Sequence, residues 1–255
     1  MRKWIFISMV LSPFLFFSQT KLKNYKKETK MGTETKMKVE IWSDIMCPFC
    51  YIGKRHYEQA IKQFADSANV ELEWHSFQLD PDLPKPASKL STYEYLAQRK
   101  GMSTEQSKSM HQGVLKMAEA SGLHYDFDKA IVANSFDAHR LIQFAKTKGF
   151  GDEAEERLFK AYFTEGKDMC NADTLLALAK EMGLNEAEAK EVINGTAFSA
   201  EVNKDIKEAE QIGVTGVPFF VFDRKYAVSG AQPSAQFLSV LQKSFAEWKK
   251  SSSVK

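Results

Sequence analysis

Short apolar runs near both ends of the chain predict β-strands. The run VEIWSD, residues 39–44, is rich in β-branched and aromatic side chains and predicts a short buried strand. Residues 70–79 place apolar side chains at alternate positions and predict a second strand, which the proline-rich stretch DPDLPKP ends. Farther along, VPFFVFD and KYAVSG, within residues 217–230, predict two strands joined as a hairpin around Asp223 and Arg224.

Apolar positions spaced three and four residues apart predict helices. One such stripe begins directly after the first strand, where Pro48 suits the first turn of a helix because its missing N–H needs no partner there. The spacing then dominates from Thr92 to Gly213, without a fixed period, so this block is helical but is not a repeat array. A last helix follows Pro233. Asparagines suited to N-caps and glycines suited to C-caps divide the helical block: Asn171, Asn185, Gly149, Gly183, Gly195 and Gly213.

The predicted elements run in the order β-α-β, a helical block, then β-β-α. This order predicts an α/β protein in which a helical domain is inserted between two halves of one sheet-containing unit. We assign residues 37–80 to the first half, 81–213 to the inserted helical domain and 214–250 to the second half. The last helix of the insertion can also be assigned to the sheet-containing unit. Residues 1–36 and 251–255 lie outside these units as an N-terminal segment and a tail.

The N-terminal segment is signal-like and is followed by a polar linker. It begins MRKWIFISMVLSPFLFF, in which two basic residues precede an apolar run shorter than a membrane span. We favour a cleaved export signal, which implies an exported or periplasmic protein with no stable membrane span in the mature chain. The alternatives are an uncleaved anchor and an over-long start, with translation beginning at Met31 or Met37 and a cytoplasmic protein.

Composition and charge narrow the classes of function. The chain has 255 residues, of which 44% are hydrophobic and 27% charged, as in an ordinary soluble globular protein of one or two domains. Its net charge of +2 argues against nucleic-acid binding, which usually needs a clustered basic face. Three cysteines are too few for a disulfide-stapled fold, so apolar burial must supply the core.

Two of the cysteines, Cys47 and Cys50, are placed for redox chemistry. The preceding strand and Pro48 put Cys47 at a helix N-terminus, where unpaired N–H groups and the helix dipole favour a thiolate, the species that attacks disulfides. Cys50 lies on the same helical turn and can close a disulfide with Cys47 or resolve a mixed disulfide with a substrate. A structural zinc site needs about four ligands, and the histidines form no second ligand pair, while inert core cysteines leave Pro48 unexplained. We therefore expect a redox-active disulfide, with no metal and no other cofactor.

Two segments far apart in the chain resemble one known family. SDIMCPFCYIGK, residues 43–54, and GVTGVPFFVFDRKYAVSGAQP, residues 213–233, together resemble the DsbA-like thioredoxin-fold oxidoreductases, specifically the FrnE-like branch. The resemblance extends over about residues 37–248. It implies a thioredoxin fold, β-α-β … β-β-α, with a large all-helical domain inserted between the halves. It also implies a thiol–disulfide oxidoreductase with Cys47 as nucleophile and Cys50 as resolving thiol.

The same resemblance gives a role to Val217 and Pro218. In thioredoxin folds the matching proline is cis and lies beside the active-site cysteines, so that Val217 offers backbone hydrogen bonds to a docked substrate strand. Without the cysteine pair, Pro218 would be interpreted as a plain proline at the start of a strand. Pro48 and Phe49 lie between the cysteines and are active-site neighbours, and this dipeptide is expected to tune the reduction potential without an imidazole.

Five other polar residues are candidates of lesser weight. Asp44 precedes the motif and is expected to oppose thiolate formation if it lies close to it. We interpret His56, farther along the same predicted helix, as a surface residue. NSFDAHRLIQFA matches a segment typical of the FrnE-like branch, which would put His139 and Arg140 near the cleft between the domains, but we interpret them first as partly exposed helix residues. Cys170 is interpreted as a small half-exposed residue rather than a third redox partner.

Three classes of function remain. The leading one is an oxidoreductase acting on a protein or small-molecule thiol or disulfide, with an unidentified partner that regenerates the pair. The related 2-hydroxychromene-2-carboxylate isomerases and kappa-class glutathione transferases bind glutathione and use a serine where Cys47 stands, so the second cysteine disfavours that alternative. A chaperone-like binder would hold unfolded chains around Pro218 and Phe219 and would need neither cysteine. Export favours an oxidase or isomerase, and a cytosolic location favours a reductase.

Overall fold

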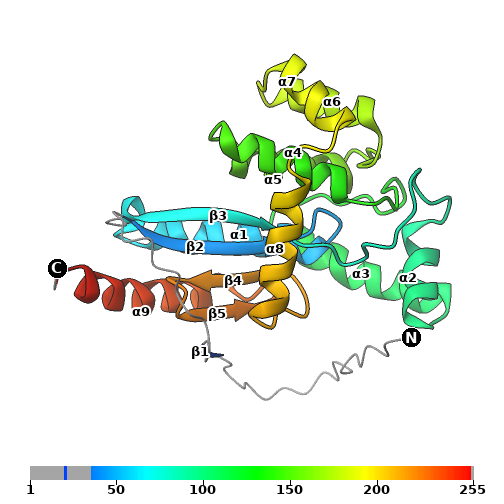
Figure 1. Cartoon of the computed structure of the whole chain (residues 1–255). Coiled ribbons are helices and arrows are strands. Elements are labelled where there is room, and N and C mark those ends of the chain that lie inside the picture. Colours follow the sequence, from blue (N-terminus) through cyan, green and yellow to red (C-terminus); the bar gives the residue numbers. More distant parts are fainter. Residues whose placement is uncertain (1–19, 22–35, 254–255) are drawn as a thin grey trace.

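The architecture is a central mixed sheet with helices packed around it (Figure 1). The computed structural model describes residues 20–21 and 36–253. In this part of the chain, five strands form one sheet in the order β1-β5-β4-β2-β3. The β2–β3 pair is parallel, and the β2–β4, β4–β5 and β1–β5 pairs are antiparallel. The strands are β1 (Thr20–Lys21), β2 (Met37–Ser43), β3 (Val70–Ser76), β4 (Phe219–Phe222) and β5 (Tyr226–Ser229).

The helices occupy the segments that the apolar spacing predicts. Helices α2 to α8 lie between the two halves of the sheet in sequence, and the predicted N-caps Asn171 and Asn185 accept hydrogen bonds from the amides of Thr174 and Glu188. The helices are α1 (Pro48–Gln63), α2 (Thr92–Lys100), α3 (Thr104–Ala120), α4 (Phe136–Thr147), α5 (Gly151–Phe163), α6 (Ala172–Glu181), α7 (Glu186–Asn194), α8 (Ser199–Gln211) and α9 (Ser234–Ser253).

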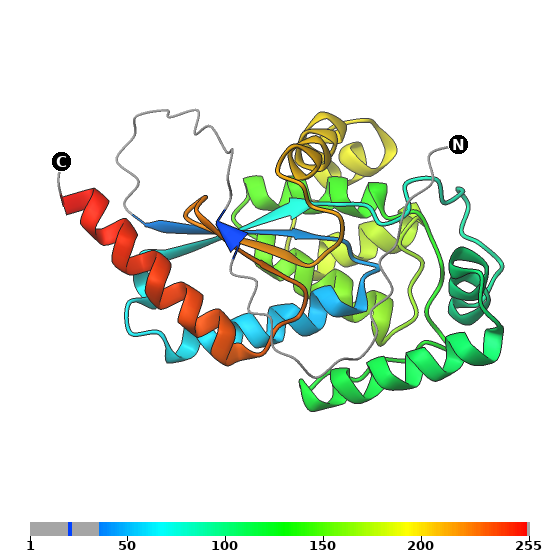
Figure 2. The same cartoon turned by 90° about the horizontal axis from the view of Figure 1, so that it is seen from below.

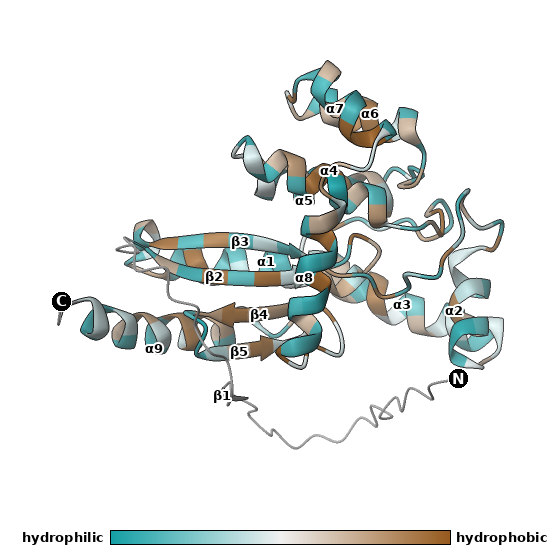
Figure 3. Ribbon diagram, viewed as in Figure 1, coloured by the Kyte–Doolittle hydropathy of each residue, from teal (hydrophilic) through white to brown (hydrophobic). Residues whose placement is uncertain are grey.

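Strand β2 is buried on both faces because helices cover both sides of the sheet. Its residues Val39 and Ile41 pack with α1 and α9, whereas Trp42 on the opposite face packs against Ala209 of α8. Figure 2 shows α1 and α9 on one side of the sheet and α8 on the other. The adjacent residues Ile41 and Trp42 point to opposite faces and are both buried, as expected of a strand covered on both sides. Figure 3 shows hydrophobic colour over much of β4 and β5.

The β2–α1–β3 unit, followed by the β4–β5 hairpin and α9, is a thioredoxin fold. The parallel β2–β3 pairing needs a crossover, and α1 supplies it. Helices α2 to α8 form the helical insertion between β3 and β4. The predicted fold class is therefore confirmed.

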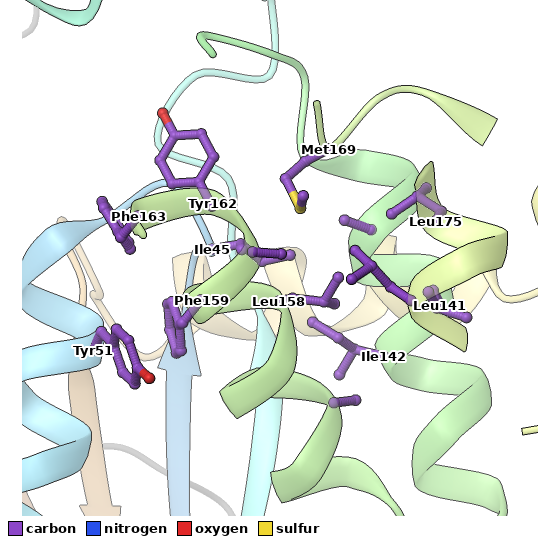
Figure 4. Packing of buried hydrophobic residues seen from close by; sticks show 14 of the residues in the cluster. Ile45, Tyr51, Leu141, Ile142, Leu158, Phe159, Tyr162, Phe163, Met169 and Leu175 are labelled. Atoms are coloured by element: carbon purple, nitrogen blue, oxygen red, sulfur yellow. The ribbon is translucent and has the colours of Figure 1, made fainter. Parts of the chain in front are cut away.

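The core of the insertion is continuous with the residues around the cysteine motif. Ile45 and Tyr51 flank the motif and belong to the same buried cluster as Leu141 of α4 and Phe159 of α5. Figure 4 shows these side chains converging between the motif and the helices of the insertion. Phe159 stacks on Tyr51 with ring centroids 4.9 Å apart. The insertion therefore supports the first turns of α1 by direct packing.

Two local features refine the predictions. The second strand ends at Ser76 rather than Leu79, because its partner β2 ends at Ser43 and the chain then turns into the proline-rich segment. The predicted hairpin is confirmed, and its turn residues Asp223 and Arg224 have φ values of 48° and 53°. Such a pair of left-handed residues is typical of a type I′ turn, whose twist matches that of the strands.

The predicted N-terminal signal-like segment and linker lie outside the described residues, apart from Thr20, Lys21 and Lys36. Thr20 and Lys21 form β1, which extends the sheet at the edge of β5 and which the apolar pattern does not predict. No helix in the described ranges is both long enough and apolar enough to cross a bilayer.

Candidate active site

The two cysteines of the motif lie at the N-terminal end of α1. Cys47 is the N-cap residue with φ −89° and ψ 110°, and Pro48 is the first helical residue. The Cys50 amide donates to Cys47 O at 3.0 Å, which places both sulfurs on the first turn. Both thiols are free and buried, with Cys47 3% and Cys50 1% exposed. The Cys47 side chain makes no capping hydrogen bond, so the positive end of the helix faces a site where negative charge on sulfur is favoured.

The start of β4 lies against this turn. The Cys47 thiol donates to Val217 O, with 3.3 Å between sulfur and oxygen. The Val217–Pro218 peptide bond is cis, and Pro218 O accepts from the Gly230 amide at 2.8 Å. The structure thus brings together Cys47, Cys50, Val217 and Pro218, which come from segments far apart in the sequence.

The Cys50 sulfur lies in a more protected environment than a surface thiol. Burial raises the pKa of the Cys50 thiol well above its ordinary value, and the hydrogen bond and charge of Cys47 raise it further. The Asp44 amide and the Ser43 side chain act in the opposite direction by interacting with the Cys50 sulfur. Cys50 therefore holds its proton more firmly than an ordinary thiol does.

Residues 38–242 match the family model described as the DSBA-like thioredoxin domain. The chain belongs to the DSBA-like thioredoxin domain family. The match includes nearly all of β2, the strands β3 to β5, the helical insertion and the first part of α9. It does not include β1. The suspected family is confirmed.

Individual relatives agree with this assignment. The chain is 31% identical over 186 residues to the uncharacterized protein YwbO of Bacillus subtilis, covering 72% of this chain and 85% of that protein. It is 37% identical to a solved structure of a probable DsbA oxidoreductase from Streptomyces coelicolor, with a TM-score of 0.79 and coverage of 83% and 91%. A 2-hydroxychromene-2-carboxylate isomerase has the same fold, with 12% identity, a TM-score of 0.60 and coverage of 86% and 100%.

Aromatic residues surround the motif of this DSBA-like domain. Phe49, between the cysteines, is 38% exposed. Tyr125, from the loop between α3 and α4, donates its hydroxyl to Pro48 O at 2.8 Å and stacks on Phe163. Burial raises the pKa of Tyr125, and nearby Cys47 raises it further. The sequence reasoning missed Tyr125 because its loop has neither apolar periodicity nor a motif, so no signal in the chain pointed to it.

Asp44 is oriented differently from what the sequence suggested. Its carboxylate accepts hydrogen bonds from the amides of Met46, at 3.2 Å, and Leu79, at 2.7 Å, and lies 3.5 Å from His139 Nε2. These donors and the imidazole compensate its charge, so the expected opposition to a thiolate is reduced. Asp44 instead joins the cysteine turn to the helical insertion.

His139 and Arg140 are not partly exposed, so that interpretation was wrong. They are 0% and 3% exposed because α4 packs against α5, α6, α7 and α8 and has little free surface. Arg140 Nε donates to Ala197 O at 2.8 Å, and Arg140 also pairs with Asp137. Arg140 therefore holds the insertion together, whereas His139 contacts Asp44 beside the active site.

His56 and Cys170 also have defined positions. His56 is half-buried rather than a surface residue, because its ring nitrogens lie 2.8 Å from Gln232 O and 3.1 Å from the Ser121 hydroxyl. Cys170 is half-exposed, as expected, and its amide donates to Asp168 Oδ1. Burial raises the pKa of Cys170 to about 11, which disfavours a reactive thiolate.

The strongest cluster of metal-ligand side chains lies on the α8 side of the sheet. His75 forms one group with Glu40 and Glu73 and another with Asp205 and Glu208. Burial opposes the charge of His75, but its contacts with Asp205 and Glu40 outweigh burial and raise its pKa to about 9. The imidazolium and the Arg224 guanidinium, which pairs with Glu40 and Glu208, therefore balance these carboxylates. The cluster is an internal ion-pair network.

Gly53 provides a test of how closely α1 and β4 pack. A Cβ at Gly53 would lie 3.0 Å from Pro218 Cγ and 3.4 Å from Phe220 Cζ. At an exposed position inside a helix, alanine stabilises the helix by about 1 kcal/mol relative to glycine. Overpacking against the rigid proline ring, however, costs about 1–3 kcal/mol of stability. We expect Gly53→Ala to lower the free energy of unfolding in urea by about 1 kcal/mol.

Gly113→Ala is the matched control for this substitution. Gly113 lies inside α3, and a Cβ there would meet no atom within 4 Å. This variant should gain up to about 1 kcal/mol of stability. Equal gains in both variants would show that α1 and the Pro218 ring are not in close contact.

Proposed function

We propose that this protein is a thiol–disulfide oxidoreductase in which Cys47 is the nucleophile and Cys50 the resolving thiol. The main observation in support of this proposal is the position of the Cys47 sulfur, which lies at the N-terminus of α1 and 3.3 Å from Val217 O. A helix N-terminus favours the thiolate that disulfide exchange requires. The buried Cys50 lies on the same turn, and burial raises the pKa of its thiol, so that Cys50 holds its proton while Cys47 attacks.

The proposed exchange balances as two successive thiolate attacks. The Cys47 thiolate attacks one sulfur of a substrate disulfide, a Cys47–substrate bond forms, and the other substrate sulfur leaves with the electron pair. Cys50 then loses its proton and attacks the Cys47 sulfur, forming the Cys47–Cys50 disulfide and releasing the second substrate thiolate. The substrate gains two electrons and the cysteine pair loses two. In reverse, the same steps donate a disulfide to a substrate dithiol.

The surroundings of the sulfurs support a disulfide-bearing chain or small molecule as the substrate. The Cys47 sulfur contacts the Val217 backbone oxygen, and Phe49, between the two cysteines in the chain, is partly exposed. Such a site binds a substrate by backbone contacts and apolar packing around its reacting sulfur. Each turnover changes the redox state of the pair, so the cycle requires a second thiol or disulfide partner, but no metal or organic cofactor.

The glutathione-dependent isomerase or transferase of the same fold is less well supported. The likeness to the 2-hydroxychromene-2-carboxylate isomerase is one of fold, at 12% identity. Cys47 and Cys50 both lie on the first turn of α1, and a reaction that needs a single thiol-activating group leaves Cys50 without a role. Two adjacent thiols favour the redox reaction.

Trapping the mixed disulfide tests the proposed function. In Cys50→Ala the first attack occurs but the resolving step is absent, so a Cys47–substrate disulfide should accumulate with a cystine-linked model peptide. Mass spectrometry of the digested protein should find the adduct on the peptide that contains Cys47. Cys170→Ala is the control and should release both peptide thiols without a lasting adduct. Absence of an adduct at Cys47 in Cys50→Ala would contradict the assignment.

A further inference from the structure

Three buried titratable side chains gather behind the cysteine turn from three different elements. Asp44 lies between β2 and α1 and is 1% exposed, His139 lies on α4 and is 0% exposed, and Glu155 lies on α5 and is 1% exposed. His139 Nε2 and Asp44 Oδ1 are 3.5 Å apart. Within the described residues, both ring nitrogens of His139 and Glu155 Oε2 are buried without a hydrogen-bond partner. Buried polar atoms of this kind are rare in folded proteins and are often found at functional sites.

Asp44 connects this cluster to both sulfurs through its backbone. Its carbonyl oxygen accepts from the Cys47 amide at 2.9 Å, and its own amide interacts with the Cys50 sulfur. Its carboxylate is held by two backbone amides and by His139. A change in the charge or position of this carboxylate therefore acts on the turn that carries Cys47 and Cys50.

The charges of the cluster depend on one another. Burial disfavours the charged form of His139, but Asp44, Glu155 and Asp205 of α8 favour it, and the net effect raises its pKa. Burial is the main reason that the pKa of Glu155 is raised to about 7: the charges of Asp152 and Asp44 act in the same direction, and those of His139 and of Lys54 on α1 oppose the rise. Near neutral pH the cluster therefore gains or loses a proton at Glu155.

We propose that Asp44 and His139 are positioning residues for the disulfide exchange and that the proton on Glu155 adjusts the balance between the dithiol and the disulfide. This inference rests on the proposed function of the cysteine pair. With Glu155 ionised the three side chains carry one more negative charge than with Glu155 protonated. That charge disfavours a thiolate on the neighbouring turn and so disfavours the reduced pair. The helical insertion thereby makes the redox equilibrium depend on pH beyond the titration of the thiols themselves.

The test is the redox equilibrium constant of the full protein against glutathione from pH 5.5 to 8.5, measured for wild type and Glu155→Gln. Glutamine reproduces the neutral carboxyl, so the two proteins should coincide at the acidic end. Above pH 8, Glu155→Gln should favour the dithiol over wild type by about threefold to tenfold, because it lacks the buried negative charge. Glu153→Gln is the matched control, since Glu153 is exposed on the same helix, and it should follow wild type throughout.

His139→Gln provides an independent variant, and far-UV circular dichroism verifies that each variant is folded. Loss of the imidazolium leaves Asp44 uncompensated, so this variant should favour the disulfide relative to wild type at neutral pH. Superimposable pH profiles for wild type and Glu155→Gln, with a normal two-electron transition in both, would overturn the inference and leave the proposed function intact. Absence of any two-electron transition in wild type would overturn the proposed function itself.

Discussion

Replacing Cys47 by serine is expected to lower the rate of disulfide reduction by about a thousandfold or more. A serine hydroxyl does not ionise at neutral pH and cannot form the mixed disulfide. It is, however, similar in shape to the thiol. The residue caps α1 with its backbone and makes its side-chain contact with Val217 O, which a hydroxyl can also make. The fold should therefore survive. The rate is measured by reduction of insulin with dithiothreitol or glutathione as the electron donor, and the fold by far-UV circular dichroism.

Cys170→Ser is the control for the removal of a thiol as such. Cys170 is half-exposed and lies beside Asp168, away from the contacts that define the Cys47 site. This variant should retain the wild-type rate. If Cys47→Ser retained its activity while Cys170→Ser lost it, the nucleophile would have been assigned to the wrong cysteine.

Replacing Phe159 by alanine is expected to cost about 3–5 kcal/mol of the free energy of unfolding. Phe159 is fully buried on α5, stacks on Tyr51 of α1 at 4.9 Å, and meets Trp74 of β3 edge-on at 6.5 Å. It therefore links the helical insertion to both the active-site helix and the sheet. Truncation removes these contacts and leaves a cavity between α5, α1 and β3 that these elements cannot fill by small shifts. Urea unfolding followed by circular dichroism measures the loss.

Phe150→Ala is the matched control for this loss. Phe150 precedes α5 and is 37% exposed, so the same truncation removes much less buried surface and should cost under about 1 kcal/mol. The large cost at Phe159 depends on the insertion sharing a core with α1. Equal and small costs at the two positions would mean that the insertion packs only loosely on the thioredoxin unit.

Most of the architecture could be predicted from local patterns. The α1 stripe is readable because burial of one helix face imposes a period on the sequence, and β2 is readable from its β-branched and aromatic side chains. The turn at Asp223 and Arg224 was located by the two strand patterns on either side of it. The relation between Cys47 and Pro218 could not be derived from spacing, since a helical insertion of any length can separate the two segments; it came from the resemblance to a family.

The missed features are contacts between elements rather than properties of elements. His139 lies next to the apolar stripe of α4, and periodicity alone assigned it to a partly exposed face. It is buried because several helices surround α4, which a single helical pattern does not reveal. Glu155 on α5 was missed for a similar reason: it lies in the acidic run DEAEE, residues 152–156, and glutamates are rarely buried. The pairing of β1 with β5 depends on backbone hydrogen bonds and left no mark in the apolar pattern.

The central claim is that Cys47 and Cys50 form a reversible redox pair. The most direct measurement is an equilibrium titration of the wild-type protein in glutathione buffers, followed by acid quenching, thiol alkylation and mass spectrometry of the digested chain. The account predicts one cooperative two-electron transition in which Cys47 and Cys50 lose their alkylation together and become linked, while Cys170 remains alkylated. If Cys47 and Cys50 stayed alkylated across the whole range, or changed independently of each other, the claim would be contradicted.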